Sequence, residues 1–151
     1  MYKNTERRIT MNYTTTEQSK KLVELGLNPD TADMAIVKDN TYCNALSAFN
    51  GVTLCQNYNE IKDKANYIPC WSLGALLEVM PPYLFEWERG IDLNIYSNLN
   101  GKGWHASYMP NNIIDMQKDK FRQITNGNTP LEAAYSMVIW LLENGYIKTE
   151  K

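Results

Sequence analysis

The C-terminal stretch TNGNTPLEAAYSMVIWLLENGYI, residues 125–147, constrains the fold of this chain most strongly. Thr129 can cap a helix, a proline follows at the first helical position, and Glu132 stands three residues after the cap, which together predict a helix start. Glu132 and Ser136 are the only polar residues of this helix before its last turn. Because its polar stripe is so narrow, the helix must be covered on more than one side. Gly145 fits the left-handed position that ends a helix.

The segment before this helix alternates between apolar and polar residues, which is typical of strands with one covered face. Three runs show this pattern, at residues 83–88, 91–96 and 104–108. We predict a fourth strand at residues 121–125, because it would lead directly into the helix. The expected sheet is antiparallel and covers one side of the C-terminal helix.

A second helix is expected after Ser72, whose hydroxyl can cap its first turn. Two consecutive prolines after Met80 prevent it from continuing. Its apolar residues recur at the three- and four-residue spacing of one buried face, so it is the natural second cover of the C-terminal helix. The predicted face consists of Leu73, Leu76, Leu77 and Met80.

Two helical segments are expected near the N-terminus. Thr14 and Glu17 form a predicted capping box, and Gly26 fits the end of this first helix. Asn28 can cap a second, short helical turn that starts at a proline and ends near Met34.

The predicted organisation is a single α+β domain over residues 11–151, preceded by a polar, flexible extension over residues 1–10. It comprises an antiparallel sheet of three to four strands packed on a C-terminal helix, with two N-terminal helical segments. Residues 35–66 show no clear pattern, apart from an Asn-Gly pair that favours a hairpin turn. Met11 is a candidate second translation start, since the first helix signal follows it directly.

The composition argues against several classes of function. The net charge is −2, so no basic excess is present to neutralise nucleic-acid phosphates. No apolar run of about 20 residues is present, so we expect no membrane-spanning helix. The three cysteines form no zinc-site spacing and favour free thiols in a reducing cytoplasm. We expect no metal and no cofactor.

Two side chains are candidates for catalysis, although no catalytic motif is present. His105 is the only histidine and would need a carboxylate, such as Asp92 or Glu86, to act as a general base. Cys70 precedes the helix capped by Ser72 and would need to be a thiolate to act as a nucleophile. A surface histidine and a buried thiol are the simpler interpretations of these two residues.

Aromatic residues on the predicted sheet suggest a binding surface instead. The candidate binding residues are Tyr96, Trp104, His105 and Tyr108. An exposed aromatic face suits a partner protein, because Tyr and Trp favour such contacts. A stacked base of single-stranded nucleic acid is the alternative ligand, but the acidic balance counts against it.

Most of the chain from about Met11 is similar to uncharacterised proteins of gut Bacteroidales bacteria and of their phages and mobile elements. The stretches NYTTTEQSKKLVELGLNPDTADM, PCWSLGALLEVMP and GNTPLEAAYSMVIWLLENGYI carry this resemblance. The sheet followed by a Gly-x-Thr-x-x-Glu-Ala helix start also resembles the HicB antitoxin core. The matching residues are Gly127, Thr129, Glu132 and Ala133.

From the resemblance and the lack of catalytic motifs, we expect a cytoplasmic, non-enzymatic accessory protein of a phage or mobile element. It would act through a protein partner or as a homodimer. A small enzyme that uses His105 or Cys70, and a single-stranded nucleic-acid binder, are the alternatives.

Overall fold

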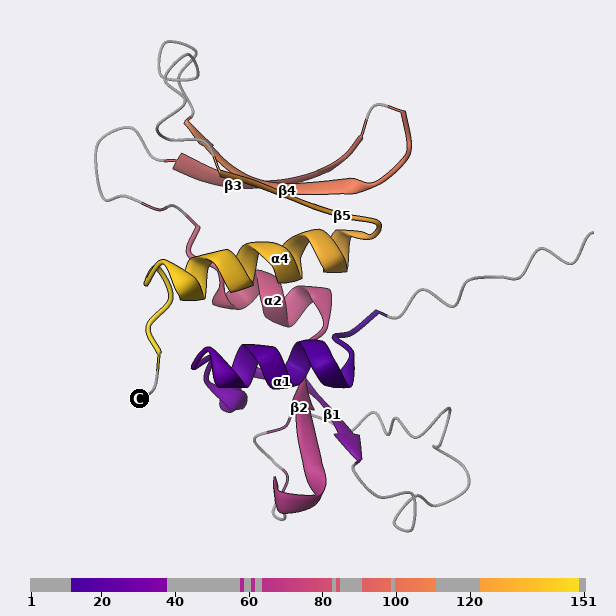
Figure 1. Ribbon diagram of the computed structural model, residues 1–151, viewed down its shortest axis with the longest axis vertical. Helices are drawn as coiled ribbons and strands as arrows, with labels where there is room; N and C mark the ends of the chain where they lie inside the picture. Colours follow the sequence, from indigo (N-terminus) through magenta and orange to yellow (C-terminus); the bar gives the residue numbers. More distant parts are fainter. Residues whose placement is uncertain are drawn as a thin grey trace, which may run out of the picture.

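The computed structural model describes residues 12–37, 58, 61, 64–82, 84, 91–98, 100–110 and 123–149. In this part of the chain, helices lie between a three-stranded antiparallel sheet and a two-stranded antiparallel sheet (Figure 1). The predicted α+β class, with a C-terminal helix packed on a sheet, is confirmed.

The labels follow Figure 1. The helices are α1 (Thr16–Glu24), α2 (Leu73–Val79) and α4 (Pro130–Glu143), with short 3-10 helices η1 (Pro29–Thr31) and η4 (Lys64–Asn66). The strands are β1 (Met34–Val37), β2 (Tyr67–Cys70), β3 (Ile91–Ser97), β4 (Trp104–Pro110) and β5 (Gln123–Gly127). β1 pairs with β2, and the larger sheet has the order β3-β4-β5.

Helix α4 begins and ends where the sequence predicts. The Thr129 hydroxyl accepts a hydrogen bond from the Glu132 main-chain N–H at 3.1 Å. The Thr129 hydroxyl thus satisfies a donor that the first turn leaves open, whereas the Glu132 carboxylate accepts a hydrogen bond at 2.7 Å from the N–H of Asn128, one residue before the cap. At the other end, Gly145 has a φ of 74° and closes the helix.

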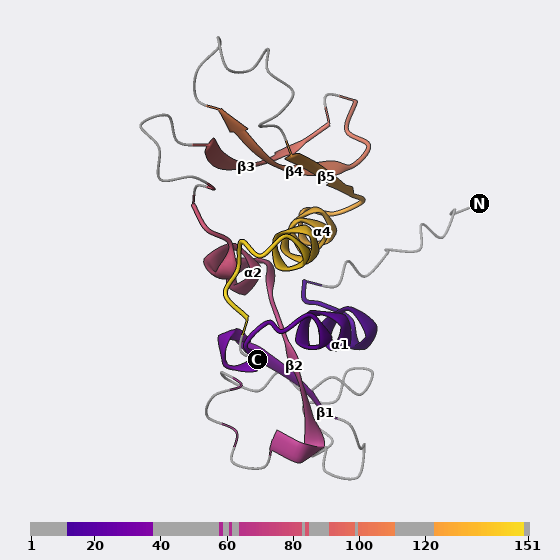
Figure 2. The same ribbon diagram turned by 60° about the vertical axis from the view of Figure 1, so that its left-hand side comes forward.

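Helix α4 is the central element of the core, as its narrow polar stripe predicts. It packs against the strands of the larger sheet on one side and against α2 on another, and α1 lies beyond it (Figure 2). Its buried residues belong to one apolar cluster that also includes Leu22 of α1, Leu76 of α2 and Tyr108 of β4. The buried residues of α4 are Leu131, Ala133, Ala134, Met137, Val138, Leu141 and Leu142.

The larger sheet contains three of the strands that the sequence indicates. The predicted strand at residues 121–125 corresponds to β5, two residues further along the chain. Its pairing with β4 sets Trp104 opposite Gly127 and Tyr108 opposite Gln123. Two predictions lie outside the described residues: the strand at residues 83–88, apart from Leu84, and the hairpin turn at residues 50–51.

The cap of α1 differs from the prediction by one residue. Thr15, not Thr14, is the N-cap, and it forms a capping box with Gln18 instead of Glu17. Thr14 is instead fully buried, and its hydroxyl accepts a hydrogen bond from the Trp71 N–H at 3.0 Å. The long-range contact with Trp71 therefore takes the Thr14 hydroxyl that was predicted to cap α1.

Two further expectations were wrong. The second helical turn ends at Thr31, and Met34 starts strand β1, which pairs with β2. Leu77 was expected on the buried face of α2, but 37% of its surface is exposed. Helix α2 has only about two turns, and its face toward α4 is occupied by Leu76 and Met80.

Candidate interaction site

The side chains of strand β4 alternate between the two faces of the larger sheet. Ala106 and Tyr108 are fully buried in the core beside α4, and the Tyr108 hydroxyl donates to the Pro81 carbonyl at 2.6 Å. Trp104 lies on the same side at the end of the sheet and is half-buried. Tyr96 and His105 lie on the opposite face, which we name the open face because Tyr96 is exposed on it, although Ser107 on the same face is fully buried. The structure therefore brings two of the four candidate residues together and places Trp104 and Tyr108 on the helix side.

The open face carries a row of three side chains across the sheet. Tyr96, His105 and Asn126 are direct cross-strand neighbours on β3, β4 and β5. The rings of Tyr96 and His105 are in contact, with centroids 5.2 Å apart and planes tilted by 40°. Tyr96 is 39% exposed, which makes it one of the exposed large apolar side chains among the described residues. Cross-strand pairs of this kind hold side chains in fixed positions on a sheet.

Two amide side chains flank the His105 ring. Nδ1 contacts the Asn126 side-chain oxygen, and Nε2 contacts the Asn98 side-chain oxygen. Asn98 also donates its Nδ2–H to the Lys102 carbonyl at 2.8 Å, which fixes the orientation of its amide. In this orientation the Asn98 side-chain oxygen faces Nε2 of His105. The imidazole is held on both sides by neutral groups.

The predicted pairing of His105 with a carboxylate is not found among the described residues. Asp92 is four residues from Tyr96 on β3, or about 13 Å along the strand, so it is not a neighbour of His105. Glu86, the other expected partner, lies outside the described residues. A general base needs an acceptor nitrogen that faces a substrate, whereas both ring nitrogens of His105 face amides. Among the described residues, no group of three or more His, Cys, Asp or Glu side chains could hold a metal ion.

Cys70 lies in a separate buried cluster below α1. Its Sγ–H donates to the Thr14 carbonyl at 3.1 Å, and only 1% of its surface is exposed. Burial raises the pKa of this thiol from 9.0 to about 11, against the opposing effect of hydrogen bonds from Thr14 and Ser19. The group is thus a thiol at neutral pH. A catalytic nucleophile needs a depressed pKa, so this geometry does not support the Cys70 alternative.

We predict that iodoacetamide alkylates Cys70 at pH 8 about a hundredfold more slowly in the native chain than in urea, because the raised pKa alone lowers the thiolate fraction by that factor. Peptide-resolved mass spectrometry separates Cys70 from the other two cysteines and measures each rate. Because the pKa of Cys70 is higher in the folded chain, the protonated thiol contributes to the free energy of unfolding. This contribution is fully present below about pH 9 and is lost as the pH rises toward 11. Native and unfolded rates within tenfold of each other would contradict the burial of a neutral thiol.

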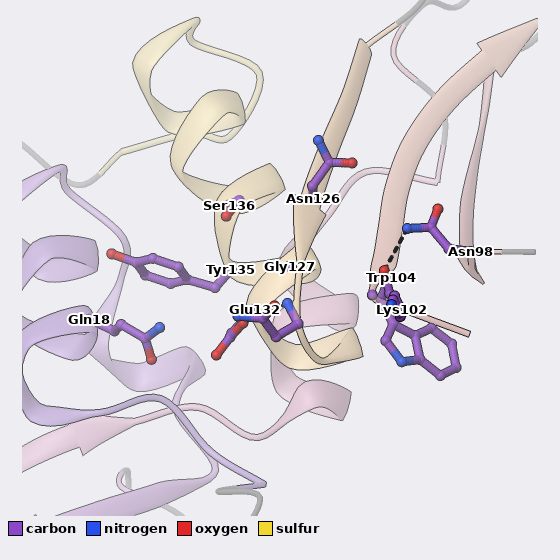
Figure 3. Close-up of a pocket in the computed structure, with 11 residues that line it drawn as sticks. Gln18, Asn98, Lys102, Trp104, Asn126, Gly127, Glu132, Tyr135 and Ser136 are labelled. Atoms are coloured by element: carbon purple, nitrogen blue, oxygen red, sulfur yellow. Dashed lines mark hydrogen bonds between the residues drawn. The ribbon is translucent and has the colours of Figure 1, made fainter. Parts of the chain in front are cut away.

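A polar groove lies on the helix side of the same sheet end. It has a volume of about 490 Å³ and extends between α1, the start of α4 and the end of β5. Figure 3 shows Gln18, Glu132 and Tyr135 on one side of the strand that carries Asn126 and Gly127, and Trp104 and Lys102 on the other. Asn98 and Asn126 contribute both to this groove and to the amide contacts of His105.

Sequence reasoning did not identify Gln18, Asn98, Asn126 or Tyr135 as site residues. They come from three elements and from the turn after β3, and no local spacing joins them. Only the pairing of β4 with β5 and the packing of α1 near α4 bring them to one place. The strand alternation, however, correctly placed His105 on the face opposite Ala106 and Tyr108.

None of the helices in the described part of the chain has the length and apolar character needed to cross a membrane. Comparisons of the sequence with protein-family models and with curated proteins, and of the structure with solved structures, give no match. The functional interpretation of this chain therefore depends on its own geometry.

Proposed function

We propose that this chain is a non-enzymatic binding protein that contacts a partner protein through the open face of its larger sheet. The contact residues are Tyr96, Asn98, His105 and Asn126. The observation that carries the proposal is the His105 ring, held between two neutral amides and beside an exposed tyrosine. Such an arrangement offers fixed hydrogen-bonding groups and an aromatic surface, which suits recognition.

The alternative of single-stranded nucleic-acid binding receives less support. A stacking platform needs successive exposed aromatic side chains along a basic groove. Trp104 and Tyr108 face the helix side, so the described open face keeps only Tyr96 and the His105 ring for stacking.

The proposed setting is the cytoplasm, where a free, buried thiol such as Cys70 is stable. An accessory role in a phage or mobile element remains part of this proposal, on the basis of the resemblance given above.

A photo-crosslinking residue at position 96 tests the proposed face. We expect p-benzoylphenylalanine in place of Tyr96 to form a discrete crosslinked product in cells that express the chain. The matched control carries the same residue in place of Lys20, which is exposed on α1. A product of equal yield from both positions, or no product from position 96, would contradict the proposed contact. The mass of the product distinguishes a second copy of the chain from another protein.

A further inference from the structure

Strand β5 is the outer strand of the larger sheet, and its outer edge is unpaired in the described part of the chain. β5 pairs with β4 over all five of its residues, one residue opposite one. No main-chain hydrogen bond joins its other edge to a further described segment. Figure 2 shows β5 at the border of the sheet, above the N-terminal part of α4.

The geometry identifies the main-chain groups that face outward. The Gly127 carbonyl lies 3.2 Å from the position that a Cβ would take on Gly103, next to the start of β4, so Gly127 faces inward. Successive residues of a strand direct their N–H and C=O groups to opposite sides. Thr125 therefore also faces β4, whereas Ile124 and Asn126 direct their N–H and C=O groups to the outer edge, where no described segment pairs with them.

This edge lacks the features that usually prevent strand addition. Its five residues QITNG contain no charge and no proline, and the one-to-one register leaves no bulge. Unprotected edges of this kind bind extended peptides by adding a strand to the sheet.

The polar groove lies at the Asn126–Gly127 end of this strand and indicates the occupant. An added strand would run about 4.8 Å from β5, with alternate side chains directed to the open face and to the groove. The groove presents amides, hydroxyls and aromatic edges, and its Lys102 and Glu132 carry opposite charges. Interfaces of obligate homodimers are more apolar than this lining. The chemistry favours an extended peptide with uncharged polar side chains over a second copy of the chain.

We infer that β5 binds an extended peptide segment of a partner protein as a fourth strand, with its alternate side chains in the groove lined by Gln18, Glu132 and Tyr135. This inference rests on the proposed function, since it specifies the form in which the partner is recognised. It adds main-chain pairing at β5 to the side-chain contacts of the open face.

The test uses a phage-displayed library of random twelve-residue peptides, selected on the full chain. In the variant Ile124→Pro, an outward N–H is removed but the pairing with β4 is kept, so selected peptides should bind it about tenfold more weakly. The control Ile124→Ala removes the side chain, keeps the N–H and should bind within threefold of the wild type. Amide hydrogen exchange on the unmodified chain is a second measurement, and it does not depend on the folding of a variant. A bound peptide should slow exchange at Ile124 and Asn126 and leave Thr125 unchanged.

Three outcomes would overturn the inference. In the first, selection enriches no peptide. In the second, the enriched peptides bind Ile124→Pro as tightly as the wild type and do not slow exchange at β5. Alternatively, light scattering shows a wild-type dimer that Ile124→Pro converts to a monomer, which assigns the edge to a second copy. Crosslinking from position 96 is measured separately, so failure of the β5 edge can be distinguished from failure of the open face.

Discussion

The variant Gly127→Ala should unfold with a free energy lower than that of the wild type by about 3 kcal/mol or more. A Cβ at this position would lie 2.4 Å from the Ala133 main-chain nitrogen and 2.6 Å from the Glu132 Cβ. Neither group is the flexible end of a side chain, because both belong to the first turns of α4. The strand cannot easily move away, since Gly127 pairs with Trp104 on its other side. Urea denaturation followed by circular dichroism measures the loss.

The matched control for this change is Gly74→Ala in α2. Gly74 is exposed, and a Cβ there would contact only the Ser72 hydroxyl at an ordinary 3.6 Å. Alanine is the better helix former by about 1 kcal/mol, so this variant should be as stable as the wild type or more stable. Equal effects of the two changes would show that the approach of β5 to α4 is looser than the structure indicates.

The close approach at Gly127 gives a physical account of the HicB-like helix start. Gly127 allows the strand to contact the helix, and Ala133 is fully buried. The Thr129 hydroxyl accepts from the Glu132 N–H, and the Glu132 carboxylate accepts from the Asn128 N–H just before the helix. The Thr125 hydroxyl also donates to the Ala133 carbonyl at 2.9 Å, which fastens the strand to the first turn. These residues serve capping and packing, so their resemblance concerns architecture and does not transfer a function.

Elements with strong local signals could be predicted from the sequence. The caps and stops of α2 and α4 follow from Ser72, Thr129 and Gly145, each of which acts on residues within one turn. The pairing of β1 with β2 could not be predicted, because it joins Met34 to Cys70 across a segment without clear pattern. The start of α1 could not be predicted to the residue for the same reason, because Thr14 bonds to the distant Trp71 and Thr15 caps the helix.

In the candidate site, too, the features set by local sequence could be predicted and those set by long-range contacts could not. Strand alternation correctly separated His105 from the face of Ala106, because period-two geometry is local. It could not show that Tyr108 would be fully buried beneath the sheet, or that Asn98 and Asn126 would flank the histidine. Those contacts depend on the register between strands, which is set by pairing and by turn geometry.

Trp71 should be the most sensitive single side chain outside α4, and Trp71→Ala should cost about 3–5 kcal/mol of unfolding free energy. Its side chain is fully buried, and its indole N–H donates to the Thr31 hydroxyl at 3.0 Å. Its main chain pairs with Thr14 in both directions, so the residue joins the N-terminal segment, η1 and α2. Trp71→Phe keeps most of the volume and loses the hydrogen bond, so we expect a smaller loss of about 1–2 kcal/mol.

The comparison with Trp140→Ala separates burial from the mere loss of a large side chain. Trp140 is half-buried on α4 and stacks on Tyr146 with ring centroids 5.3 Å apart, so its loss should cost about 1–2 kcal/mol. Far-UV circular dichroism is the appropriate signal, because each variant removes a fluorophore. If Trp71→Ala produced a second unfolding transition, the two-stranded sheet with α1 would unfold apart from α4. A single transition at lower urea is the expected result, since Leu22, Trp71 and Met137 belong to one apolar core.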